Sequence, residues 1–207
     1  MPGLPLQTDA FVLARRPPSD SFQSFTLFSA EHGPLLALQR LPRKVASSAT
    51  AVALDLFDEV SLQLESSNQG QTWFVKEARL LTRHPGLGRS YETLTAASDL
   101  ARLIARNPVH EESRAAVAAL LRQALASLAA GARPDIVWFK SLYCFARDEG
   151  YPVKQEWFPM LTAAEREGVA ALLNRPLSGQ TAAPELVTRL ARRLADYLRG
   201  HTEILLE

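Results

Sequence analysis

The sequence predicts an α+β protein in which a small, closed five-stranded β-barrel is followed by an all-α domain. Residues 1–82 contain five short β-favourable runs that are separated by turn residues and show no helical period. A Pro/Gly-rich link at residues 82–88 follows, and beyond it apolar residues recur at helical spacing. We therefore expect two domains, residues 1–82 and residues 83–207.

Composition indicates a soluble, globular chain. Of its 207 residues, 47% are hydrophobic and 22% are charged, with a formal net charge of +1. Cys144 is the single cysteine, which excludes an internal disulfide and a cysteine-ligated zinc site and suits a reducing compartment. The N-terminus lacks signal-peptide features, and no apolar run is long enough to span a bilayer. We expect a cytoplasmic location.

The first three strands are short runs of apolar and β-branched residues. Residues 1–8, which contain Pro2 and Pro5, are expected to form a loose arm before them. Gly33 lies in the turn between the second and third strands, where it supplies the positive φ that tight turns often need. The three strands are expected at residues 11–13, 25–28 and 35–38.

The fourth and fifth strands complete the barrel. A small, polar loop at residues 41–51 leads to a strand at about 56–65, in which Val60, Leu62 and Leu64 alternate with polar residues. A turn at residues 66–70 precedes the fifth strand, at about 72–79. Five strands in so short a segment suit a small closed barrel.

The first two helices are predicted from apolar stripes. The first stripe ends at Asn107-Pro108, because the residue before proline disfavours helix. The second, stronger stripe is stopped by Gly131. The first stripe consists of Leu94, Ala97, Ala101 and Ile104, and the second of Val117, Leu120, Leu121, Ala124, Leu125 and Leu128.

Three further helices follow. Pro134 begins a helix that ends at Gly150 and is apolar nearly all round, so we expect it to be central to the domain. Thr162 and Glu165 form a capping-box pattern that opens a shorter helix. After a loop at residues 174–184, a last amphipathic helix is expected at residues 185–199, closing at Gly200.

No arrangement of residues in the sequence indicates catalysis or a cofactor. The four histidines, His32, His84, His110 and His201, are scattered and have no partner at metal-ligand spacing. Cys144 falls within an apolar helix, where a thiol behaves as a small hydrophobe. The phosphate-binding, dinucleotide-binding and nucleophile-elbow motifs are all missing from the sequence. We expect no enzyme activity.

The N-terminal stretch resembles a known family. Two arginines after an apolar strand, a Pro-Ser-Asp turn and the run FTLFSAEHGPL resemble the start of the bacterial RecO family of recombinational DNA repair proteins. The similarity continues through residues 60–64 and 73–81 and, more weakly, through the helical part. The resemblance implies that the barrel is an OB-fold.

Basic residues on one side of this barrel are candidate DNA contacts. Residues 11–50 carry five basic and two acidic side chains, whereas residues 51–82 carry two basic and five acidic ones, which indicates one basic rim. OB-folds bind oligonucleotides on strands two and three and in adjoining loops. Phe22 is a candidate for stacking on bases, whereas Phe25 and Trp73 are expected in the core. The predicted DNA-binding residues are Arg15, Arg16, Phe22, Arg40, Arg43 and Lys44. The alternative for the paired arginines is that they are simply solvated.

The resemblance also implies function and partners. Members of the RecO family bind single- and double-stranded DNA, anneal complementary strands, and load RecA together with RecR and the single-stranded DNA-binding protein SSB. The acidic, apolar C-terminal tail of SSB needs an apolar groove rimmed by cations. Candidate rim residues are Arg102, Arg106, Arg122 and Arg133. The alternative for each is an ordinary exposed helix charge.

Two departures from the family pattern weaken the expected DNA affinity. Many RecO-like proteins hold zinc with four cysteines in the C-terminal half, but here no cysteine follows Cys144 and a capping-box helix stands in that place. The net charge is also low for a nucleic-acid binder. An alternative function is therefore a RecO-derived protein-interaction adaptor with weak or no DNA binding.

Overall fold

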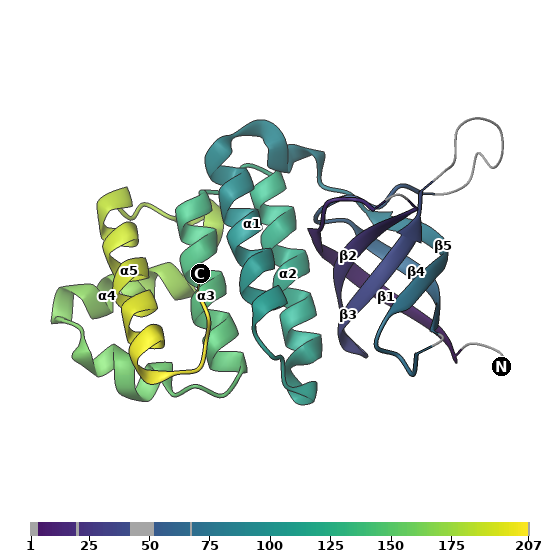
Figure 1. Ribbon diagram of the computed structural model, residues 1–207. Helices are drawn as coiled ribbons and strands as arrows, with labels where there is room; N and C mark the ends of the chain where they lie inside the picture. Colours follow the sequence, from purple (N-terminus) through teal and green to yellow (C-terminus); the bar gives the residue numbers. More distant parts are fainter. Residues whose placement is uncertain (1–3, 20, 42–51, 67, 207) are drawn as a thin grey trace. The chain divides into compact units, whose positions relative to one another are not determined.

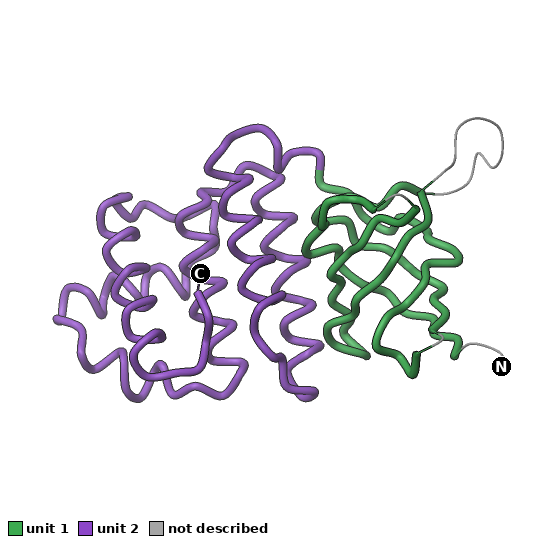
Figure 2. The backbone as a smooth tube through the Cα atoms, viewed as in Figure 1, with its two compact units in different colours: residues 1–84 green, residues 85–207 purple. Residues whose placement is uncertain are grey.

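The computed structural model describes residues 4–19, 21–41, 52–66 and 68–206. The chain divides into two compact units, residues 1–84 and residues 85–207 (Figure 2). This division falls two residues after the predicted boundary at residue 82. The first unit consists of strands and the second of helices (Figure 1), so the α+β architecture is confirmed.

The β unit is a five-stranded sheet whose hydrogen bonds form a closed ring (Figure 1). The strand order is β1-β2-β3-β5-β4, and β4 pairs back onto β1. Neighbouring strands are antiparallel except β3 and β5, which are parallel. The strands are β1 (Leu4–Arg15), β2 (Phe22–Ser29), β3 (Gly33–Arg40), β4 (Glu59–Ser66) and β5 (Trp73–Thr82).

The start of the chain differs from the prediction. Residues 4–8, expected in a loose arm, belong to β1 and pair with β4 from Leu4–Ser66 through Phe11–Glu59. Thr8 and Ala10 are buried while Gln7 and Asp9 are exposed, which is the alternation of a half-buried strand. Pro5 lies near the start of the strand, where a proline is tolerated, so it does not prevent β1 from forming.

The ends of the last two strands also differ from the prediction. β4 begins at Glu59 and not at Leu56, because Phe57 has a φ of 68° that a strand cannot contain. The backbone N–H of Asp55 donates to Oδ2 of Asp58 at 3.0 Å and closes this turn. β5 continues to Thr82 instead of ending at Arg79. The prediction for Gly33, whose φ is 70°, is confirmed.

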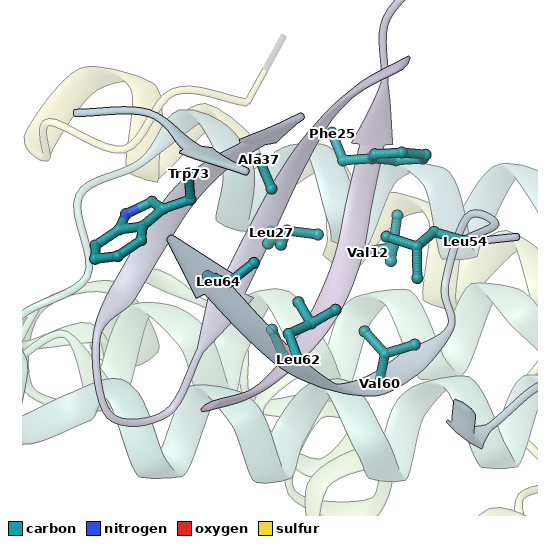
Figure 3. Close-up of a cluster of buried hydrophobic side chains, with 10 residues drawn as sticks. Val12, Phe25, Leu27, Ala37, Leu54, Val60, Leu62, Leu64 and Trp73 are labelled. Atoms are coloured by element: carbon teal, nitrogen blue, oxygen red, sulfur yellow. The ribbon is translucent and has the colours of Figure 1, made fainter. Parts of the chain in front are cut away.

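Alternate residues of the strands fill the interior of the β unit. Figure 3 shows side chains from all five strands meeting in one cluster. Phe25 is 1% exposed and Trp73 is 6% exposed, which confirms their predicted place in the core. The cluster consists of Ala10, Val12, Phe25, Leu27, Ala37, Leu54, Val60, Leu62, Leu64 and Trp73. The opposite side chains of each strand therefore point outward.

The helical unit has five α-helices. The predicted central helix, α3, contacts each of the other four, so that prediction is confirmed. The helices are α1 (Tyr91–Arg106), α2 (Arg114–Ala129), α3 (Pro134–Asp148), α4 (Ala163–Asn174) and α5 (Pro184–His201). Within the described residues, no helix combines the length and apolarity that crossing a bilayer requires.

Most helix ends follow the sequence signals. Asn107 ends α1, and Gly131 and Gly150 take positive φ just after α2 and α3. The capping box of Thr162 and Glu165 at the start of α4 is confirmed.

Two predictions in the helical unit were wrong, and one short turn was not predicted. Leu94 is 42% exposed and Leu100 is buried in its place. Gly200 lies inside α5, which continues to His201 because the helix cap forms at Thr202. A short π-helical turn at Val153–Trp157 was not predicted, since a single turn has no periodicity to detect.

Candidate nucleic-acid interface

The outer face of β2, β3 and β5 carries two phenylalanines and an arginine. In the β2–β3 register Phe22 lies opposite Arg40, and Ser24 lies opposite Leu38. The parallel β3–β5 pairing then places Phe74 beside Leu38. Phe25, Ala37 and Trp73 belong to the core cluster, so their neighbours along the strands face outward.

The two phenylalanine rings contact each other on this face. The centroids of Phe22 and Phe74 are 5.7 Å apart, and the ring planes are inclined at 66°. This is an edge-to-face contact, which aromatic pairs favour over direct stacking. Both residues and Leu38 remain partly exposed. We refer to Phe22, Leu38 and Phe74 as the aromatic platform.

Cations border the platform. Arg40 is exposed at the end of β3, where the backbone N–H of Leu41 donates to the carbonyl of Ser21 at 2.9 Å. The backbone N–H of Arg16 donates to the carbonyl of Ser24 at 3.1 Å, which continues the row that contains Ser24, Leu38 and Phe74. Of the predicted DNA-binding residues, the structure therefore brings Phe22, Arg16 and Arg40 to one face.

Arg15 lies one residue away from this row and has an ion-pair partner. Its register partner on β2 is Phe25, whose side chain points into the core. Nη1 of Arg15 is 3.9 Å from Oδ1 of Asp55, and both side chains are more than half exposed. This is a weak, solvated pair. The remaining predicted DNA contacts, Arg43 and Lys44, lie outside the described residues.

Phe74 is one of the strand aromatics on which bases could stack, but it was not among the predicted DNA-binding residues. The signal was present in the Trp73-Phe74 dipeptide, because consecutive strand residues point to opposite sides of a sheet. Once Trp73 was assigned to the core, Phe74 had to face outward. Its proximity to Phe22 depends on the parallel β3–β5 pairing, which the sequence does not reveal.

The four candidate partner-binding arginines lie in the helical unit and have different surroundings. Arg102 pairs with Asp99 at 2.9 Å and lines a small cavity of about 90 Å³. Arg106 and Arg122 are exposed on α1 and α2. Arg133 binds the carboxylate of Asp135 and donates to the carbonyl of Ala182. The cavity is lined by Asp99, Arg102, Leu103, Trp138, Leu205 and Leu206.

The histidines and the single cysteine lie in surroundings with an ordinary structural explanation. Nδ1 of His110 is 2.7 Å from Oε2 of Glu149, which links the segment before α2 to the C-cap of α3. Burial lowers the pKa of His84 and raises the pKa of the partly buried Cys144 thiol. Among the residues that the structure describes, no three His, Cys, Asp or Glu side chains are arranged to hold a metal ion.

Comparisons with known proteins do not assign the chain to a family. No family model matches the sequence, and no curated protein matches it significantly. The resemblance to the RecO family therefore rests on the motifs quoted above.

Proposed function

We propose that the β unit is an OB-fold and that the protein is a RecO-like mediator of DNA repair and recombination, which binds DNA without bond-breaking chemistry. The observation that carries this proposal is the strand order, β1-β2-β3-β5-β4 closing onto β1, with β3 and β5 parallel. A five-stranded Greek-key ring is the architecture of the OB-fold. OB-folds bind oligonucleotides across strands two and three and in the loops that follow strands one and four.

The side chains on that face support the same proposal. Arg16 and Arg40 border the aromatic platform of β2, β3 and β5, and Arg15 precedes the loop between β1 and β2. Guanidinium groups bind phosphates and release condensed counterions, so capture is electrostatic and weakens with salt. In this proposal the protein binds single- and double-stranded DNA, promotes annealing, and works with RecR and SSB to load RecA in the cytoplasm.

The helical unit offers a candidate place for the tail of SSB. The cavity beside Arg102 combines a cation with the side chains of Trp138, Leu205 and their neighbours. An acidic, apolar peptide end needs both kinds of contact. Within this proposal Arg102 is the best supported of the four candidate rim arginines, because it is the one that lines this cavity, although it also pairs with Asp99.

Salt-dependent binding of labelled DNA tests the proposal. Replacing Arg15 and Arg16 together by alanine should weaken DNA binding several-fold and reduce the slope of log K against log salt. A matched control replaces Arg175 and Arg192, two exposed arginines of the helical unit, and removes the same charge. The proposal is contradicted if the wild-type protein does not bind DNA, or if both double variants lose the same affinity.

One observation favours the alternative of a protein-interaction adaptor. Residues 1–84 carry eight basic and eight acidic side chains, so the β unit has no net charge with which to attract DNA. Under the adaptor hypothesis, an SSB-tail peptide binds to the wild-type protein and not to the Arg102→Ala variant, while DNA binding remains undetectable at low salt.

A further inference from the structure

The aromatic platform is a partly exposed apolar cluster on the outer face of the β unit. Its residues are not members of the core cluster, which fills the interior without them. Phe22 and Phe74 nevertheless stay partly exposed, with Arg40 opposite Phe22 on β3 and Arg16 opposite Ser24 at the end of β1. Apolar rings set among phosphate-binding groups suggest a ligand that has both phosphates and flat apolar surfaces.

The ring geometry leaves surface for such a ligand. Because the planes of Phe22 and Phe74 are inclined at 66°, the edge of one ring covers at most one face of the other. Leu38 and Arg40 lie beside the pair as outward neighbours on β3 and extend it along the strand. A nucleobase can therefore reach an aromatic face while its phosphate reaches Arg16 or Arg40.

We infer that the aromatic platform binds unpaired nucleobases by stacking, so that the protein prefers single-stranded over double-stranded DNA. This inference rests on the proposed function, which by itself gives no strand preference. In a duplex the faces of the bases are stacked on one another, and only the phosphates, the sugars and the base edges in the grooves are available to the protein. In a single strand the bases can turn outward, and every base has a face that a phenyl ring can contact.

The test compares three ligands of equal length: a single strand, the same backbone with abasic sites, and a duplex. Fluorescence anisotropy with the full chain measures each affinity. We expect the wild-type protein to bind the base-bearing strand about tenfold more tightly than the abasic strand. The variants Phe22→Leu and Phe74→Leu should remove most of this advantage and leave abasic-strand affinity and its salt dependence unchanged.

Two further variants separate stacking from packing. Phe74→Trp keeps an aromatic face and should retain the preference for bases, whereas a purely structural role predicts loss in both Phe74 variants. Tyr91→Leu, at an 80% exposed aromatic of the helical unit, is the matched control and should have no effect. Circular dichroism shows whether each variant folds. If the Phe74 variants do not fold, the loss of base preference is tested with Phe22→Leu alone.

The outcomes distinguish this inference from the proposed function. Equal affinity of the wild-type protein for abasic and base-bearing strands overturns the inference and leaves electrostatic DNA binding intact. An unchanged base preference in both leucine variants also overturns it. If none of the three ligands binds, the proposed function fails and the inference fails with it.

Discussion

At the scale of single residues, partners that lie far apart in the sequence decide what each charged side chain can do. Arg15 is exposed, but Asp55 lies beside it and competes with any phosphate. Arg16 and Arg40 have no such carboxylate among the ion pairs found in the described residues. The three arginines are therefore not equivalent, although the sequence alone makes them look alike.

Asp55→Asn should strengthen DNA binding. The substitution removes the charge that faces Arg15 and can keep the hydrogen bond from the backbone N–H of Leu56. We expect about a two- to threefold gain in affinity at low salt, since exposed ion pairs are weak. Titration of labelled single strands measures it. Glu77→Gln, an exposed site in the same unit, controls for net charge, and an equal gain there would contradict the role of Asp55.

Glu165 is the residue whose ionisation should matter most for the helical unit. The backbone N–H of Thr162, the Arg193 guanidinium and the Thr162 hydroxyl donate to its carboxylate and lower its pKa from 4.5 to about 2. A lowered folded-state pKa stabilises the fold above about pH 4.5, and this stabilisation is lost as the pH falls toward 2.

Glu165→Gln should therefore lower the melting temperature at neutral pH by several degrees, because Arg193 loses its charged partner. The difference from the wild-type protein should shrink as the pH is lowered from 4.5 toward 2. Thermal melts across this pH range provide the measurement. Glu167→Gln, at an exposed position of α4, should show no comparable effect. A difference that does not change with pH would contradict the assignment.

At the scale of elements, one ion pair fixes the segment before β4. The Asp58 side chain is 1% exposed, and Arg83, just after β5, donates to both of its oxygens at 2.8 and 2.5 Å. Arg83 also donates to the carbonyl of Ala53. These bonds hold the turn in which Phe57 takes its positive φ, and they connect it to the end of β5.

Arg83→Met should destabilise the β unit by about 2–3 kcal/mol, because it leaves a buried carboxylate without its partner. Urea denaturation followed by circular dichroism measures the change. The double variant Arg83→Met with Asp58→Asn should recover part of the loss, since the uncompensated charge is gone. Arg79→Met, on the exposed side of β5, is the control. If Arg83→Met leaves the free energy of unfolding unchanged, the ion pair does not stabilise this turn.

The elements themselves could largely be predicted, and the errors have local causes. Alternation in β4, the apolar character of α3 and the capping box of α4 are signals carried by near neighbours. The first half of β1 was missed because its regularity becomes evident only through pairing with β4. Gly200 was misread as a helix end because a glycine signals an end only where its φ is positive.

At the scale of the whole molecule, the chain combines two units with separate cores and different candidate surfaces. The candidate site was predictable only in part. Arg16, Phe22 and Arg40 were identified from their places beside turns, but their meeting with Phe74 follows from the order of strands in the ring. A sequence read locally does not give that order, because parallel β3 and β5 are separated by β4 along the chain.

Photo-cross-linking of a single strand that carries iodouracil, followed by mass-spectrometric mapping of the adducts, tests the central claim most directly. If the outer face of β2, β3 and β5 is the DNA-binding surface, adducts should form at Phe22 or Phe74 and in peptides that contain Arg16 or Arg40. They should disappear at high salt, when phosphate contacts are screened. Adducts confined to the helical unit, or none at all under conditions of measurable binding, would contradict the account.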